Sequence, residues 1–183
     1  MRRLIWGKTL FESYKYIGRV VGSIDRLVLE SSANSYTTCS NTNETLDKME
    51  AVIDLIERKK RLLTIKMIIE EGVKNMDYDS AKLLIRYYVD KMDSNSIAEE
   101  FEMNRRTINR RINNAVCDCM QKIYNLGYNL KFFETLLENE GWIVGLYNSY
   151  VARYLHKDKT LVPLSIPKLK KIDRLINSVY GRV

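Results

Sequence analysis

Four arginines within seven residues form the most distinctive pattern in this chain of 183 residues. They belong to the run 104–115, which contains no acidic residue. The apolar residues of this run, Ile108, Ile112 and Ala115, recur at helical spacing, so we expect the arginines on the opposite face of one helix. Such a helix can enter the DNA major groove when one face packs on a scaffold and the other carries donors to bases and phosphates.

The polar face of this helix predicts a DNA-binding site. Arginine can form two hydrogen bonds with the O6/N7 edge of guanine, and asparagine can do the same with the N6/N7 edge of adenine. Residues at the N-terminal end of such a helix meet base edges. The predicted DNA-binding residues are Arg105, Arg106, Asn109, Arg110, Arg111 and Asn113. Arg111 lies nearer the packing face, so it reaches either a phosphate or an acid on a neighbouring helix.

The residues before the arginine run complete a predicted helix-turn-helix. A short helix is expected over 94–101, where Ser96 and Glu99 have the spacing of a capping box. After a tight turn, Asn104 is a favourable N-cap for the arginine-rich helix, which we expect to continue to Gly127.

A further helix is expected before this pair, over 80–91. Asp77 or Asp79 can cap it, and Leu84, Ile85 and Tyr88 would face inward. The helix-turn-helix domain is therefore predicted at 77–129.

Two longer helices are predicted in residues 1–76, separated by a loop at 31–45 that is rich in Ser, Thr and Asn. The first apolar stripe is Leu10, Tyr14, Ile17, Val21, Ile24 and Val28. The second, interrupted by Lys60, is Leu46, Met49, Ile53, Ile56, Leu63 and Met67. Both follow the alternating three- and four-residue spacing of helices that pack on a partner helix.

These stripes suit either an antiparallel hairpin within one chain or a coiled coil that makes a homodimer, and the pattern does not separate the two. Gly18 and Gly22 weaken the first helix unless they mark a close approach of two helices. Gly72 is a favourable C-terminal stop for the second helix.

Residues 130–183 are predicted to form a small helical extension. Short helices are expected near Phe133 and over 142–155, followed by a loop with two prolines at 156–167. A final basic helix is expected over 167–180, where Lys168, Lys170, Lys171 and Arg174 could add phosphate contacts.

Composition favours an all-α protein with an anionic partner. Only two prolines and eight glycines interrupt the chain, which favours helices over a turn-rich β fold. The net charge is +7, and the basic excess lies in the first 30 residues and beyond residue 81. Positive charge of this size suits a polyanion such as double-stranded DNA.

Other classes of protein find little support in the sequence. No apolar run is long enough for a membrane span and no signal-peptide pattern is present, so we expect a cytoplasmic protein that does not bind membranes. Three cysteines without a CxxC pair predict reduced thiols and no metal site. The only histidine, His156, has no nucleophile motif beside it, so we expect no enzyme activity and no cofactor.

About 50 residues resemble a known family. Residues 97–101, 104–108, 111–112 and Ala115 look like the C-terminal helix-turn-helix of sigma-70 family factors, known as region 4. Residues 83–90 match the helix that precedes it in that family. The order of a helix, a polar loop, a second helix and this module is similar to short phage and prophage regulators of the ArpU and late-transcription type.

The resemblance implies a DNA-binding transcription regulator that also contacts RNA polymerase. Two departures qualify it. Glu102 stands where the turn usually carries glycine, so either a left-handed backbone is adopted without glycine or the turn is altered. The first 76 residues are also too short and too poor in aromatic residues for a promoter-melting domain. The sequence therefore predicts a sigma-like regulator and not a complete sigma factor.

Two other functions are compatible with the pattern. A phage packaging subunit of the small terminase type joins a helix-turn-helix to an oligomerising hairpin and would form a ring. An interaction protein would use the sigma-like module to bind RNA polymerase or a sigma factor without reading DNA.

Overall fold

In the computed structural model, residues 1–38 and 42–165 are described, and they form an all-α fold, as predicted. The helices are α1 (Arg2–Thr38), α2 (Thr42–Lys74), α3 (Tyr78–Leu84), a π-helical segment (Ile85–Val89), α4 (Ser94–Glu100), α5 (Arg105–Asn125), α6 (Leu130–Leu137) and α7 (Gly141–Tyr154). The basic helix predicted over 167–180 lies outside the described residues.

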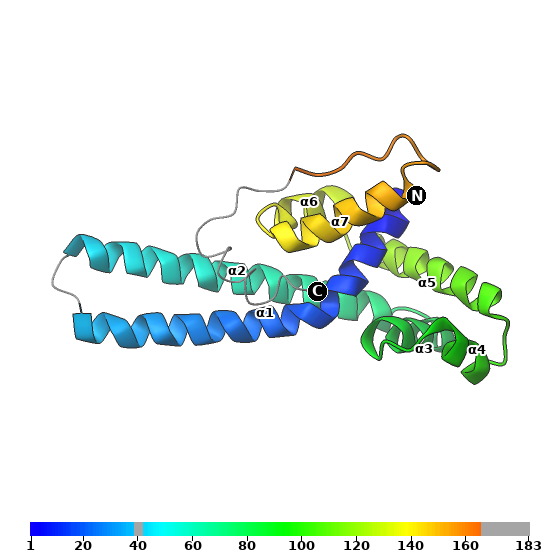
Figure 1. The fold of residues 1–183 in the computed structure, drawn as a ribbon, viewed down its shortest axis with the longest axis horizontal. Coiled ribbons are helices and arrows are strands. Elements are labelled where there is room, and N and C mark those ends of the chain that lie inside the picture. The colour runs from blue at the N-terminus through cyan, green and yellow to red at the C-terminus, as the bar shows by residue number, and fades with distance from the viewer. Residues whose placement is uncertain (39–41, 166–183) are drawn as a thin grey trace.

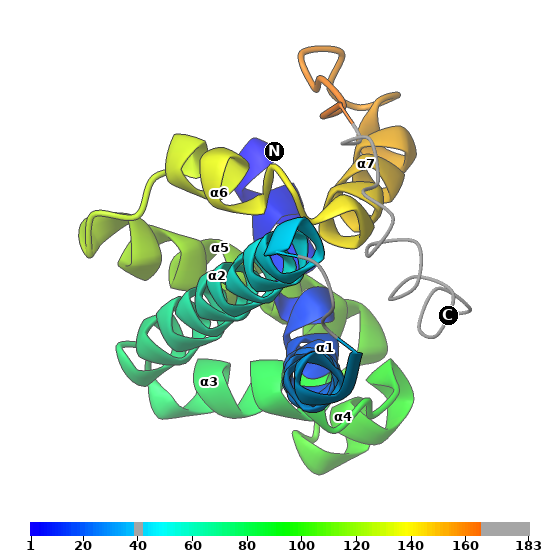
Figure 2. The same ribbon diagram turned by 90° about the vertical axis from the view of Figure 1, so that its left-hand side faces the viewer.

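The two longest helices form an antiparallel arm that extends from a helical body (Figure 1). The view along the arm shows α1 and α2 side by side, with the remaining helices around their inner ends (Figure 2). The prediction of a loop over 31–45 was wrong, because α1 continues to Thr38 and α2 already begins at Thr42. The Ser32 hydroxyl donates to the Val28 carbonyl oxygen one turn earlier, so this side chain is accommodated within the helix.

The α1 stripe is confirmed as a packing face, since Leu10, Ile17 and Ile24 are fully buried. The α2 stripe is not: all six of its apolar residues are exposed, which contradicts the prediction that the hairpin buries it. The face that α2 turns inward carries Leu55, Leu62, Ile65, Ile68 and Ile69. Helix α2 is thus apolar on two sides, and only one of them packs within the chain.

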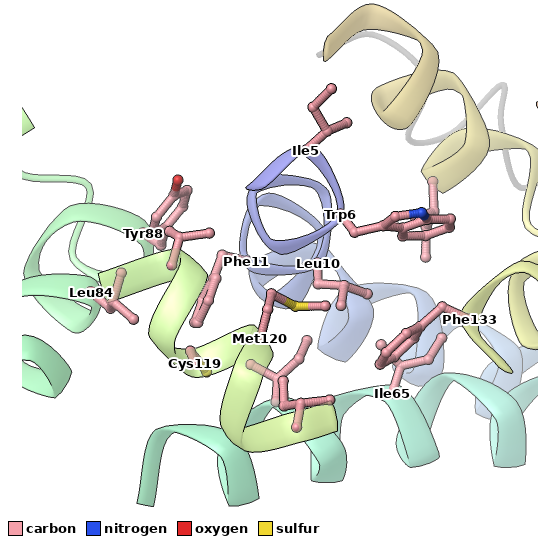
Figure 3. Packing of buried hydrophobic residues seen from close by; sticks show 14 of the residues in the cluster. Ile5, Trp6, Leu10, Phe11, Ile65, Leu84, Tyr88, Cys119, Met120 and Phe133 are labelled. Atoms are coloured by element: carbon pink, nitrogen blue, oxygen red, sulfur yellow. The ribbon is translucent and has the colours of Figure 1, made fainter. Parts of the chain in front are cut away.

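The core forms where the N-terminal part of α1 passes between α5 and α7. Trp6 packs with its ring centroid 4.6 Å from that of Tyr147 and 6.2 Å from that of Phe133. On another side of α1, Phe11 stacks on Tyr88 at 5.2 Å. Figure 3 shows Trp6, Phe133, Phe11 and Tyr88 around α1, together with Leu10, Cys119 and Met120. One buried cluster therefore joins the arm, the helix-turn-helix and the C-terminal helices.

Two glycines permit the close approach of α5 to the long helices. A Cβ atom on Gly7 would lie 2.4 Å from Val116 Cγ1, and one on Gly72 would lie 2.5 Å from Ile123 Cγ1. Gly72 was predicted to end α2, but it lies inside the helix, buried against α5. The close approach proposed for Gly18 and Gly22 was also wrong, since nothing lies within 4 Å of a Cβ placed there.

A buried ion pair fixes α7 to the arm. Arg58 of α2 donates hydrogen bonds to the Glu140 carboxylate from Nε to Oε1 at 3.0 Å and to Oε2 at 3.3 Å, and from Nη2 to Oε2 at 2.9 Å. The Trp142 indole nitrogen donates to the same carboxylate at 3.1 Å. Glu140 is fully buried and Arg58 nearly so. Such a pair holds one geometry strongly, because neither charge tolerates the loss of its partner.

Candidate nucleic-acid interface

Besides α1 and α2, the arginine-rich helix packs on α3 and α4, and α3 continues into the π-helical segment. We call α3, the π-helical segment and α4 the scaffold. Asp77 caps α3 as predicted, its carboxylate accepting from the Ser80 backbone N–H at 2.9 Å. The single helix predicted over 80–91 is instead an α-helix that changes to a π-helix at Ile85. The wider turn leaves Ile85 43% exposed, against the prediction, whereas Leu84 and Tyr88 are buried as predicted.

Helix α4 is capped by Asp93 and not by the predicted box of Ser96 and Glu99. The Asp93 carboxylate accepts from the backbone N–H groups of Asn95 at 2.6 Å and Ser96 at 3.1 Å. These bonds lower the pKa of Asp93, with further help from the Ser96 hydroxyl and from the charge of Arg105. The helix therefore begins three residues earlier than the Ser96 box requires, and its N-terminus holds a negative charge that the helix dipole stabilises.

The turn between α4 and α5 adopts the first of the two predicted alternatives, a left-handed backbone without glycine. Glu102 has φ of 50°, so the position commonly filled by glycine is occupied by a residue with a Cβ atom. The turn is closed by the Met103 N–H, which donates to the Ala98 carbonyl oxygen at 2.8 Å. Asn104 then caps α5 as predicted, its side chain accepting from the Arg106 N–H at 2.8 Å.

The packing face of α5 is also confirmed. Ile108, Ile112 and Ala115 are buried together with Cys119 and Ile123. Helix α5 continues to Asn125, close to the predicted end at Gly127. Its N-terminal half lies at the end of the molecule opposite the tip of the arm (Figure 1).

All four arginines of α5 are exposed. Within residues 1–38 and 42–165, none of them forms an ion pair with an acidic side chain. The cations of the scaffold behave differently, since Lys82 contacts Glu100 at 2.8 Å and Arg86 contacts both Glu100 and Asp90. The hydrogen bond from Lys82 and the charge of Arg86 lower the pKa of Glu100. Lys82 and Arg86 are thus paired within the scaffold, whereas the α5 arginines have no acidic partner among the described residues.

The predicted residues occupy three sides of α5. On a helix of 3.6 residues per turn, Arg106 and Arg110 project directly away from the buried face. Arg105 and Asn109 lie on one flank, and Asn113, half-buried, lies between that flank and the outward side. The Ser94 hydroxyl donates to the Asn109 side-chain oxygen at 3.0 Å, so this oxygen is already bonded to α4.

Arg111 lies apart from the other three arginines. It lines a recess beside the start of α3, together with Asp77, Asp79 and Asp118. Of the two alternatives predicted for Arg111, a phosphate or an acid on a neighbouring helix, the acidic surroundings favour the second. Arg111 nevertheless forms no ion pair with an acid among the described residues.

Asn114 was missed by the sequence analysis. It is exposed one turn after Arg110 on the outward side of α5. The i, i+4 spacing from Arg110 was visible in the sequence and could have identified it.

Comparisons of the chain with known protein families, with curated proteins and with solved structures found no match. Within the described ranges, no cluster of His, Cys, Asp and Glu side chains could hold a metal ion. No helix in the same residues has the length and apolar character needed to cross a bilayer.

Proposed function

We propose that this protein binds double-stranded DNA sequence-specifically and regulates transcription, with α5 as the helix that enters the major groove. The observation that carries the proposal is the contrast between two sets of cations. Lys82 and Arg86 are held by acids of the scaffold, whereas Arg105, Arg106 and Arg110 are exposed on α5 without an acidic partner among the described residues. Unpaired arginines at the N-terminal end of a rigidly packed helix suit guanine edges and phosphates.

The local geometry supports the same proposal. Helix α5 is anchored by its cap at Asn104 and by a continuous buried face, so its arginines project from a fixed backbone. The likeness of this module to sigma-70 region 4 adds RNA polymerase as a second partner. We place Arg106 and Arg110 on base edges, and Arg105 on the flanking backbone.

Selection of bound sequences from random duplex DNA, followed by salt titration, tests this function. Replacement of Arg110 by Ala should weaken binding to the selected site by about 1–3 kcal/mol and relax one base position. Replacement of Arg105 by Ala should weaken binding to all sequences alike and reduce the salt slope by about one.

Arg26 provides a matched control, because it is exposed on α1 in the arm, away from α5. Replacement of Arg26 by Ala removes the same charge and should leave sequence preference unchanged. If the wild-type protein binds all duplexes equally, or if the changes at Arg110 and Arg26 have the same effect, α5 does not read bases. Activity that persists when both Arg106 and Arg110 are replaced would instead favour a protein that binds polymerase without reading DNA.

A further inference from the structure

The outer face of α2 carries an apolar stripe, interrupted at Lys60, that nothing in the described part of the chain covers. The stripe consists of Leu46, Met49, Ile53, Ile56, Leu63 and Met67, which are between 39% and 57% exposed. It extends over 22 residues, or about 32 Å of helix from the first Cα atom to the last. Single exposed apolar residues are ordinary on a protein surface, but an ordered row of six is typical of an interface.

The spacing of the stripe is that of a two-stranded coiled coil. The residues alternate at intervals of three and four, so Leu46, Ile53, Lys60 and Met67 occupy position a of successive heptads, and Met49, Ile56 and Leu63 occupy position d. A single lysine in position a, here Lys60, lowers stability but selects register and the number of strands. The inward-facing residues Leu55, Leu62 and Ile69 all occupy position c, so the intramolecular packing leaves positions a and d free.

The charges beside the stripe favour one orientation. Position e carries Glu50, Glu57, Thr64 and Glu71 on one side, and position g carries Val52, Lys59 and Lys66 on the other. Lys59 contacts Asp25 of α1 at 2.6 Å, so Lys66 is the position-g cation that can meet a second copy. Parallel pairing sets the lysine side of one helix against the glutamate side of the next, and brings Lys66 beside Glu71 of a second copy. Antiparallel pairing would set glutamates against glutamates and lysines against lysines. The pattern is therefore self-complementary only in a parallel pair.

We infer that a second copy of this chain occupies the stripe, so that the protein is a homodimer held by a parallel coiled coil of its two α2 helices. The six half-exposed side chains offer on the order of 500 Å² of apolar surface per copy, and a pair would bury about 1,000 Å², which meets the lower limit of a specific interface. Because the dimer forms on α2 and not on α5, this inference does not depend on the proposed DNA binding.

Sedimentation equilibrium of the full-length protein without DNA tests the inference. The wild-type chain should be dimeric at about 10–100 μM, in the range where modest interfaces associate. Ile53→Glu or Ile56→Glu should weaken the dimer at least tenfold, because each places a charge in the centre of the seam. Leu29→Glu is the matched control: Leu29 is 69% exposed on α1, outside the stripe, so the same change there should leave the dimer intact.

Orientation is tested by cross-linking a Met49→Cys variant in which Cys39 and Cys117 are replaced by Ser. Cys119 can stay because it is buried and burial raises its thiol pKa to about 12. Position 49 lies opposite itself only in a parallel pair, so a disulfide-linked dimer should form on oxidation.

Three results would overturn the inference. The first is a full-length protein that stays monomeric at all concentrations. If it then dimerises when residues 166–183 are removed, that segment is the occupant of the stripe. The second is a ring-sized oligomer, which would not fit two-stranded pairing. The third is a dimer that is equally sensitive to Leu29→Glu and Ile53→Glu, which would place the interface elsewhere.

Discussion

Replacement of Arg58 by Met should destabilise the protein far more than replacement of any exposed charged residue on the arm. The Glu140 side chain is 0% exposed and that of Arg58 is 7% exposed, so removal of the arginine leaves a carboxylate without its charged partner in the interior. Breaking a buried pair in this way costs about 3–5 kcal/mol. For a chain of this size, each kcal/mol lowers the melting temperature by about 2–4 °C, so we expect a decrease of about 6–20 °C.

Two further variants identify the origin of the effect. Replacement of the neighbouring Lys59 by Met removes a pair with Asp25 whose side chains are 34% and 48% exposed, and should cost less than about 1 kcal/mol. The double replacement of Arg58 and Glu140 by Met removes both charges. It should recover most of the loss, leaving about 1 kcal/mol for the hydrogen bond of Trp142.

Urea unfolding followed by circular dichroism measures all three variants. Equal urea midpoints for the Arg58 and Lys59 variants would refute the reasoning, because loss of the buried ion pair would then cost no more than loss of the exposed one. A double variant less stable than the Arg58 variant would show that packing volume, and not an uncompensated charge, dominates at this position.

Two other predictions concern stability. Gly72→Ala should destabilise the protein by about 1–3 kcal/mol, since the new Cβ would lie 2.5 Å from Ile123 Cγ1. Gly18→Ala should stabilise it by about 0.5–1 kcal/mol, because nothing lies within 4 Å of a Cβ placed there. Both are measured by urea unfolding, and equal effects would show that α2 and α5 are not in close contact. The pKa of Asp93 is lower in the folded protein than its ordinary value, so its stabilising effect is complete above about pH 4 and is lost as pH falls through the folded-state pKa. Asp93→Asn keeps a capping oxygen and removes this titration, so the stability of the variant, measured by urea unfolding from pH 6 to pH 2, should decline less than that of the wild type.

The features of the candidate site that could be predicted are local ones. The cap at Asn104, the buried face of Ile108 and Ile112 and the end of α5 near Gly127 all depend on residues within a few turns of each other. The left-handed backbone at Glu102 was one of two alternatives given by the resemblance to sigma-70 family factors, in which glycine usually stands at this turn, and the structure adopts it. The cap of α4 was not predicted correctly, because two nearby residues, Asp93 and Ser96, could each start the helix. Asp93 has the extended backbone of an N-cap and is the one that caps it.

Features that depend on distant residues were not accessible from the sequence. The periodicity of α2 shows that a face is apolar but not which partner covers it, and a second apolar face packs inside the hairpin instead. The polar run at 31–45 favours a loop by composition, yet the two arm helices extend into it. The pair of Arg58 and Glu140 is separated by 82 positions, and no local pattern connects them.

The position of Trp6 in the centre of the body affects the order in which the protein can fold during synthesis. The side chains that cover Trp6 include Phe133 and Tyr147, so the first turns of α1 leave the ribosome well before their partners exist. The core of the body therefore closes late, when α7 has emerged, and the exposed N-terminal helix is available to chaperones until then. A nascent chain stalled before residue 130 should expose Trp6, although its helix-turn-helix sequence is already complete.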